Sequence, residues 1–147
     1  MFEKIYAFVL SLQANIVTQE EYSDYLDTLF LGDSKNELLL ELEFASNDLA
    51  KTFAVIKEAL YKRKKTLEYN VFGRVLFENI RNLYEKNSLG MEAFGHKMYR
   101  LWNLLPSEIN QIEPFWTLSY ADDCLSYGDE VQTRKLYEDT FVYKWSI

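Results

Sequence analysis

The stretch TQEEYSDYLDTLFLG, residues 18–32, decides the fold class. Thr18 is followed three residues later by Glu21, a spacing typical of the capping box that starts an α-helix. Gly32 at the far end predicts a left-handed residue that stops the helix. Between these signals, apolar residues recur three and four apart, as they do on one face of a helix: Tyr22, Tyr25, Leu26, Leu29 and Phe30. The segment therefore predicts an amphipathic helix with one buried face.

The same helical period continues on both sides of this segment. On its C-terminal side, helix caps are expected at Asp33 or Ser34 and again at Asn47. The pattern leaves open whether residues 34–64 form one bent helix or two. On its N-terminal side, residues 1–16 predict an amphipathic first helix with these residues on its apolar face: Ile5, Phe8, Val9, Leu12 and Ile16.

The remaining sequence keeps this period with short links between the segments. Tyr137, Phe141 and Trp145 are spaced by four and predict one face of a last helix. Gly128 is the expected stop before that helix. The expected helix starts are Asn70, Pro106, Pro114 and Asp129. Residues 1–147 thus predict a single all-α domain of seven or eight helices, arranged as stacked antiparallel helix hairpins.

Composition excludes several classes of protein. The chain has 147 residues, of which 48% are hydrophobic and 27% charged, which suits one folded domain rather than a disordered chain. The single cysteine, Cys124, excludes an internal disulfide framework and a cysteine-rich zinc site. The single histidine, His96, excludes a site built from several histidines. We therefore expect no metal and no cofactor.

The N-terminal segment also lacks the features of a targeting signal. Its apolar run from Ile5 to Leu12 is short, is interrupted by Ser11, and follows no basic stretch. No run in the chain approaches the ~18 apolar residues that a transmembrane helix needs. We therefore expect a cytoplasmic protein with no membrane association.

Charge is distributed unevenly along the chain. Residues 17–48 hold nine acids and one base, residues 49–105 hold eleven bases and five acids, and residues 106–147 hold eight acids and three bases. If the two acidic segments meet in the fold, they form a negative face that attracts a basic protein and repels nucleic acid. The candidate partner-binding residues are Glu20, Glu21, Asp24, Asp27, Asp122, Asp123, Tyr127, Asp129 and Glu130. The alternative is a solvated helix surface that needs no partner.

The sequence offers little evidence for catalysis or for nucleic-acid binding. The basic run at residues 62–65 fits the last turn of a helix, where cations complement the helix dipole. Asp122, Asp123 and Glu130 form an acidic group that resembles a Mg²⁺ site, which keeps a carboxylate enzyme as the least favoured hypothesis. Neighbouring carboxylates disfavour the thiolate of Cys124, so a buried structural cysteine is expected instead. We expect no catalytic residue.

Tyrosine is abundant, with eleven residues in the chain. Tyrosine is favoured at protein–protein hot spots because it supplies a large contact area at low entropic cost. The alternative is that the tyrosines line a helical core with their hydroxyls directed outward. The tyrosines that fit no core face are Tyr99, Tyr120, Tyr127 and Tyr143. Exposed aromatics of this kind also permit a second hypothesis, a structural or regulatory homodimer.

Three stretches resemble a family of small, acidic, all-helical bacterial proteins. They are LLLELEFASNDL at 38–49, MYRLWNLLP at 98–106 and EPFWTLSYADDCLSYGDE at 113–130. Similar proteins are found among the immunity proteins of polymorphic-toxin and contact-dependent inhibition systems. The resemblance implies an antitoxin-like binder that blocks a cognate toxin, often a basic nuclease, and it carries over no functional residue. The expected function is therefore a non-catalytic protein-binding module.

Overall fold

The computed structural model describes residues 1–86 and 89–145. Within these residues the protein is a single all-α domain with no strand, and the expectation of seven or eight helices is confirmed. The elements are α1 Phe2–Gln13, α2 Gln19–Gly32, α3 Glu37–Phe44, α4 Leu49–Lys62, α5 Tyr69–Lys86, α6 Met91–Leu104, α7 Thr117–Tyr120, the 3₁₀ segment η1 Ala121–Tyr127, and α8 Glu130–Phe141.

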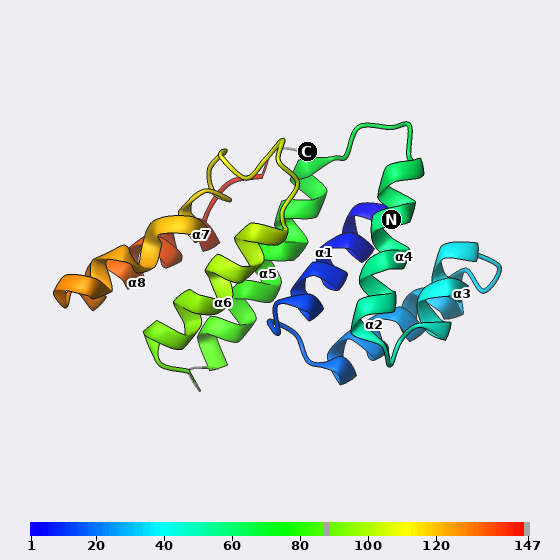
Figure 1. The fold of residues 1–147 in the computed structure, drawn as a ribbon, viewed down its shortest axis with the longest axis horizontal. Coiled ribbons are helices and arrows are strands. Elements are labelled where there is room, and N and C mark those ends of the chain that lie inside the picture. Colours follow the sequence, from blue (N-terminus) through cyan, green and yellow to red (C-terminus); the bar gives the residue numbers. More distant parts are fainter. Residues whose placement is uncertain (87–88, 146–147) are drawn as a thin grey trace.

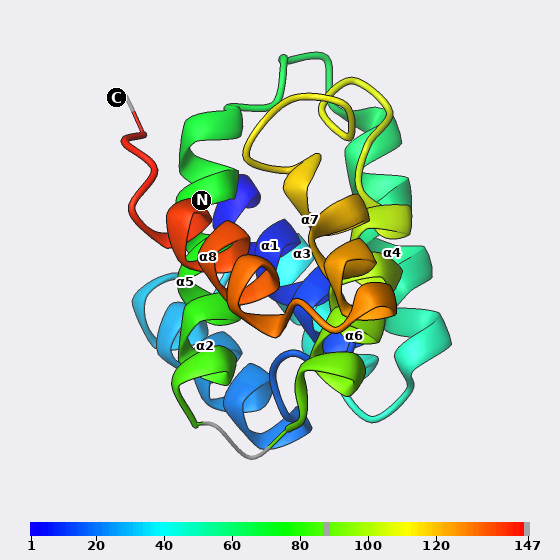
Figure 2. The same ribbon diagram turned by 90° about the vertical axis from the view of Figure 1, so that its left-hand side faces the viewer.

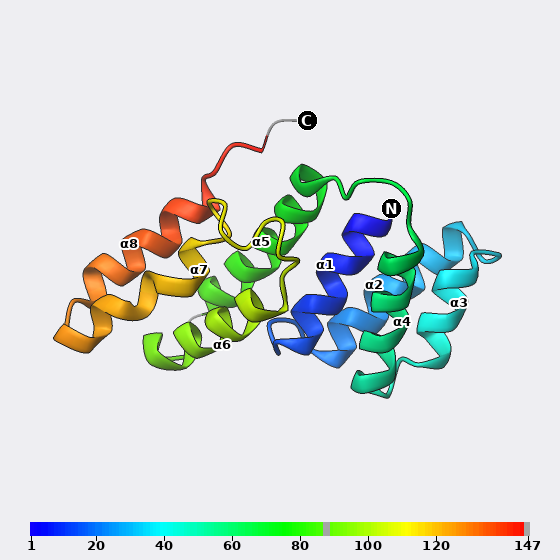
Figure 3. The same cartoon turned by 45° about the horizontal axis from the view of Figure 1, so that its top comes forward.

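The helices form a row of antiparallel hairpins along the longest axis of the molecule. Figure 1 shows α3 at one end, then α2 and α4, then α1, then α5 and α6, with α7 and α8 at the other end. The tilted view in Figure 3 shows the same order. Figure 2 looks along the row from the end formed by α7 and α8. Helices α2, α3 and α4 therefore lie on one side of α1, and α7 and α8 lie toward the opposite end of the row.

Helix α1 is the centre of the core. It packs against α2, α4, α5 and α6, so it is enclosed from several directions. The sequence predicts an amphipathic helix here, but the structure buries α1 on nearly every side, as expected for a helix surrounded by others. Its principal openings to solvent are at Lys4 and Phe8, which face the space between α2 and α5.

Several local signals are confirmed. The Thr18 hydroxyl accepts a hydrogen bond from the Glu21 N–H, and the Glu21 carboxylate accepts one from the Thr18 N–H, which completes the capping box of α2. Asp129 caps α8 by accepting from the Gln132 N–H. Gly128 adopts φ +80°, the left-handed conformation expected at a helix stop. These residues act within one turn of the chain, which is why sequence alone reveals them.

Other helix boundaries differ from the expectations. Residues 34–64 form two helices, α3 and α4. The cap of α3 is Asn36 rather than Asp33 or Ser34, and the cap of α4 is Asp48 rather than Asn47. The expected left-handed stop at Gly32 is wrong, since among the described glycines only Gly128 has positive φ. Asn36 and Asp48 each accept a hydrogen bond from the N–H three residues ahead. Asp33, Ser34 and Asn47 are also residue types favoured at helix starts, so residue type alone did not distinguish them from the true caps.

The C-terminal third departs furthest from the expected helices. Asn70 lies inside the first turn of α5 rather than capping it. The region after Pro106 forms turns, and the helix expected from Pro114 is limited to α7 and η1. The last helix ends at Phe141, so Trp145 does not continue its face. Trp145 instead folds back onto α5, with its ring against Gly73.

The tyrosine hydroxyls are more deeply buried than expected. Tyr6, Tyr22 and Tyr137 are completely buried, and none of their hydroxyls has a hydrogen-bond partner among the described residues. The expectation of core tyrosines with outward hydroxyls is therefore wrong for these three. Burial raises the pKa of each above its ordinary value. No described helix is long and apolar enough to cross a membrane.

Candidate functional site

The outward face of α2 carries most of the first group of predicted partner-binding residues. Glu20, Asp24 and Asp27 are spaced by four and three, so they share one face of the helix, and all three are exposed. Leu31 continues the same spacing and is 86% exposed. We call these four residues the acidic stripe. The three carboxylates give this face a negative charge, and Leu31 adds one exposed apolar side chain beside them.

Glu21 lies beside the acidic stripe, but its contacts are within the protein and stabilise the fold. Its carboxylate completes the capping box with Thr18 and forms an ion pair of 3.5 Å with Lys86 at the end of α5. The hydrogen bonds with Thr18, with a further contribution from Lys86, lower the pKa of Glu21 despite its partial burial. Glu21 therefore links α2 to α5, and its charge is already compensated.

The second acidic segment does not join the first. Figure 1 shows α2 and α3 toward one end of the row, and η1 and α8 at the other. The single negative face considered from the sequence, combining residues 17–48 with residues 106–147, therefore does not form. The two acidic segments of the sequence form two separate acidic regions, one toward each end of the molecule.

The residues predicted in the second segment have mostly local roles. Asp129 is the cap of α8, and Glu130 forms an ion pair of 2.9 Å with Arg134 one turn later. Tyr127 is exposed, beside the buried Cys124, and its interaction with the Cys124 thiol raises the pKa of the tyrosine. The buried cysteine agrees with the expectation. None of these contacts needs a partner.

Asp122 and Asp123 border a shallow hollow between α6 and η1. The hollow also contains His96, and the Asp122 side chain lies over Gly95, where a Cβ would come within 2.7 Å of it. Across residues 1–86 and 89–145, no group of three or more His, Cys, Asp or Glu side chains is placed to hold a metal ion. The Mg²⁺ hypothesis for Asp122, Asp123 and Glu130 therefore gains no support from the geometry.

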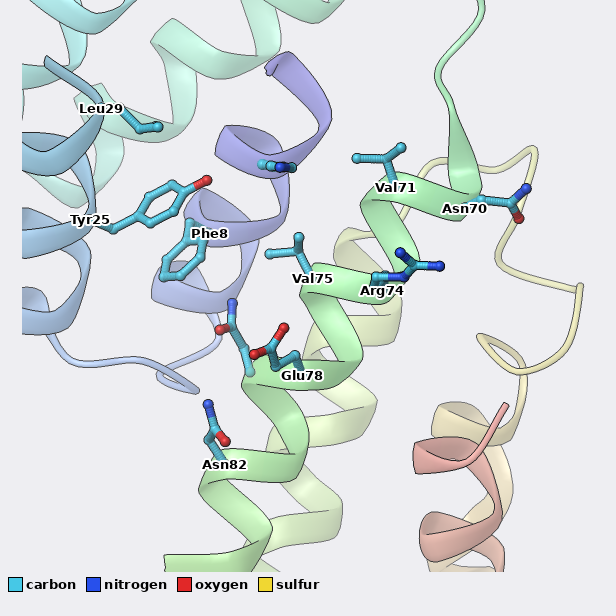
Figure 4. Close-up of a pocket in the computed structure, with 11 residues that line it drawn as sticks. Phe8, Tyr25, Leu29, Asn70, Val71, Arg74, Val75, Glu78 and Asn82 are labelled. Atoms are coloured by element: carbon cyan, nitrogen blue, oxygen red, sulfur yellow. The ribbon is translucent and has the colours of Figure 1, made fainter. Parts of the chain in front are cut away.

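A larger hollow than the one beside Asp122 and Asp123 lies on the other side of α2 from the acidic stripe. It is a groove of about 650 Å³ between α2 and α5, with α1 as its floor. Figure 4 shows the rings of Phe8 and Tyr25 beside each other, with Val71 and Val75 pointing toward them from α5. The two rings are stacked, with centroids 3.8 Å apart. We call this hollow the α2–α5 groove.

Polar groups sit at defined places in this apolar groove. Ser11 donates a hydrogen bond of 2.7 Å to the Ala7 carbonyl, so its oxygen must accept the 3.2 Å bond from the Asn79 Nδ2. Asn79 is only 7% exposed and lines the groove, so its carbonyl oxygen is the group it offers there. Glu78 lies beside it on the same wall. This part of the wall therefore presents hydrogen-bond acceptors.

The other end of the groove has the opposite charge. Lys4 and Arg74 line it near the starts of α1 and α5, where the helix dipoles are also positive. Arg74 is held in place by donating a 3.1 Å hydrogen bond to the Trp145 carbonyl. The α2–α5 groove therefore has a positive end, an apolar middle, and acceptors further along α5.

Sequence reasoning missed this groove and Leu31. Tyr25 and Leu29 read as core residues because they share a helical face with buried neighbours, whereas the structure leaves them half-buried at the groove. Leu31 had a detectable signal, since it follows Asp24 and Asp27 at helical spacing. The groove had none, because it depends on how far apart α2 and α5 lie.

Comparison with known proteins adds no assignment: no protein-family model matches the chain, and no curated protein or solved structure matches it either.

Proposed function

We propose that this protein is a non-catalytic protein-binding module, and specifically an immunity protein that neutralises a cognate bacterial toxin. Its acidic stripe would bind a basic surface of the toxin. The observation that carries the proposal is that stripe, in which Asp24, Asp27 and Glu20 share an exposed face with Leu31. Carboxylates steer a basic partner, and an exposed leucine gives it an apolar contact.

The surroundings of the acidic stripe strengthen its field. Helices α2 and α3 and their links carry nine acids and only one base, Lys35. Phe44 at the end of α3 is 85% exposed, which adds a second apolar side chain at this end of the molecule. The resemblance of residues 38–49 to immunity proteins supports the choice of partner class. We limit the binding surface to this end, because the second acidic segment lies too far away to contribute.

The test is a binding experiment with the polypeptide encoded by the neighbouring gene. We expect a stoichiometric complex by size-exclusion chromatography with light scattering, weakened by added salt. The double substitution Asp24→Lys/Asp27→Lys should weaken it by roughly tenfold or more, because it reverses charge at the centre of the surface. Circular dichroism would check that the helices remain formed.

A matched control reverses the same amount of charge at the opposite end. Asp123→Lys/Asp139→Lys changes two exposed acids of η1 and α8, and it removes only the surface ion pair with Lys135. The control should bind like the native protein. Absence of a complex at low salt would overturn the proposal. So would a complex that the control weakens more than the acidic-stripe variant does.

A further inference from the structure

The α2–α5 groove has the form of a site for one more helix. Its α5 wall runs from Asn70 to Asn82, about 18 Å along the helix, or the length of roughly 12 helical residues. Residues on α1 and α2 also line it at helical spacing, Lys4 with Phe8 and Tyr25 with Leu29. A helix placed here would contact ridges from three helices at once.

The helices on either side of the groove are not packed together along their length. Helix α2 packs on α1 and α3, while α5 packs on α1 and α8. The ion pair between Glu21 and Lys86 joins α2 and α5 at the end of the groove far from Lys4. Val71 and Val75 consequently remain only half-buried on α5. An apolar surface of this shape is the kind that takes an amphipathic helix from a partner.

We infer that the α2–α5 groove binds an amphipathic helix of the basic partner, with the C-terminal end of that helix beside Lys4. This inference rests on the proposed function for the identity of the partner. The bound helix would place apolar side chains over the Phe8–Tyr25 stack and Val75. A lysine or arginine in its first half would meet Glu78 and the side-chain carbonyl of Asn79, both of which line the groove.

Charge complementarity fixes the direction of the helix. The C-terminal end of a helix carries a partial negative charge, which Lys4 and the starts of α1 and α5 would stabilise; Arg74 borders this end, but its side chain points away from Phe8 and Tyr25 (Figure 4) toward the Trp145 carbonyl. The bound helix then runs antiparallel to α1 and α5, so its dipole also opposes theirs. A helix in the reverse direction would bring its positive end against Lys4 and its basic half away from Glu78.

The test uses a synthetic peptide as a probe. It has about 12 residues, is held helical by a hydrocarbon staple on its polar face, and carries leucines on one face. Lysines occupy its N-terminal half, and a fluorescent label reports binding by anisotropy. We expect saturable binding that Val75→Asp weakens by about tenfold or more, since this places a charge in the apolar centre. Glu78→Lys should weaken it several-fold, and the reversed-sequence peptide should bind several-fold less tightly.

A second groove variant avoids any change to a half-buried position. Asn82 is exposed at the groove edge, and Asn82→Arg would obstruct the groove with a long cation without disturbing the core. Val131→Asp on the distant α8 is the matched control and should leave binding unchanged. Peptide binding that is absent, or equal in the native protein and both groove variants, would overturn the inference. A homodimer that dissociates in Val75→Asp would also overturn it, because a second copy would then occupy the groove.

The inference and the proposed function can fail separately. If the neighbouring protein forms a complex that needs Asp24 and Asp27 but tolerates Val75→Asp and Asn82→Arg, the groove inference is wrong and the function stands. If the peptide binds in the groove as described but the neighbouring protein forms no complex, the proposed function fails and the groove remains a helix-binding site.

Discussion

Two carboxylates near the core show how neighbours decide the effect of a charge. Burial alone would raise the pKa of Glu3, but the backbone N–H of Glu68, 3.0 Å away, and the guanidinium of Arg63, 3.1 Å away, lower it below its ordinary value. Glu43 has no such partners. Burial and the facing carboxylate of Asp27 raise the pKa of Glu43.

These opposite shifts predict opposite effects of neutralising each residue. Glu3→Gln should lower the free energy of unfolding at pH 7 by about 1–3 kcal/mol, because a charged acceptor is lost. Because the pKa of Glu3 is lower in the folded state than in the unfolded state, the ionised carboxylate stabilises the folded protein at pH values above its unfolded pKa. The difference in unfolding free energy between the native protein and Glu3→Gln should therefore shrink as the pH falls below about 4. Glu43→Gln should raise the free energy of unfolding by about 1 kcal/mol at pH 7. Ionised Glu43 destabilises the folded protein, and this effect is lost when the carboxyl is protonated. The gain in unfolding free energy from Glu43→Gln should therefore disappear at acidic pH.

Urea unfolding at neutral and acidic pH measures both differences. Each variant serves as the control for the other, because both change one carboxylate to an amide. A destabilising Glu43→Gln, or a loss in Glu3→Gln that stays constant as the pH falls, would contradict the assignment. Asp27 also belongs to the acidic stripe. The repulsion between Asp27 and Glu43 therefore lowers the stability of the protein at the proposed binding surface.

At the scale of elements, Trp145, beyond the end of α8, is positioned by a contact with α5. A Cβ at Gly73 would lie 2.2 Å from the Trp145 ring, so only glycine leaves room for it. The ring also packs on Phe77 and Phe115, at centroid distances of 5.9 and 5.6 Å. Because Arg74 holds the Trp145 carbonyl, this contact also positions one end of the α2–α5 groove.

Gly73→Ala should displace Trp145 from this position. Alanine gains helix propensity of about 0.5–1 kcal/mol over glycine, but the lost aromatic packing should outweigh it and lower the free energy of unfolding by about 1 kcal/mol. Gly73→Ala should shift the tryptophan emission to the red, because Trp145 becomes more exposed to water. The same substitution in a Trp145→Phe protein should cause no shift. Gly32→Ala is the control, since nothing lies within 4 Å of its Cβ position. An unshifted emission maximum in Gly73→Ala would contradict the close contact.

Features that depend on residues close together in sequence were predicted correctly, and features that depend on distant residues were not. The capping box at Thr18 and the cap at Asp129 involve atoms three residues apart, and both were predicted. The position of Trp145 depends on a glycine 72 residues earlier, so helical spacing misassigned it to α8. The three carboxylates of the acidic stripe were predicted from the uneven charge along the chain, whereas Leu31 was missed although it has the same helical spacing within α2. The separation of the two acidic segments depended on the order of hairpins, which local patterns do not specify.

At the scale of the whole molecule, the helix at the centre of the row is surrounded by more helices than those at the ends. Helix α1 packs against four other helices, while α3 packs on α2 and α4, and α8 packs on α5, α7 and η1 at the opposite end. The two acidic ends are therefore held through α1 and α5 rather than by contact with each other. Elements with less surrounding structure open at lower free energy.

Native-state hydrogen exchange should resolve this arrangement. Amides of α1 should exchange only on global unfolding, whereas those of α3 and α8 should exchange faster through local opening. Asp129→Ala removes the cap of α8 and should speed exchange in that helix about fivefold, for a loss of about 1 kcal/mol, without changing α2. Thr18→Ala should do the reverse, speeding α2 and leaving α8 unchanged. If either variant accelerates both ends equally, the protein opens as one cooperative unit, and changes at the acidic stripe would then also be transmitted to α8.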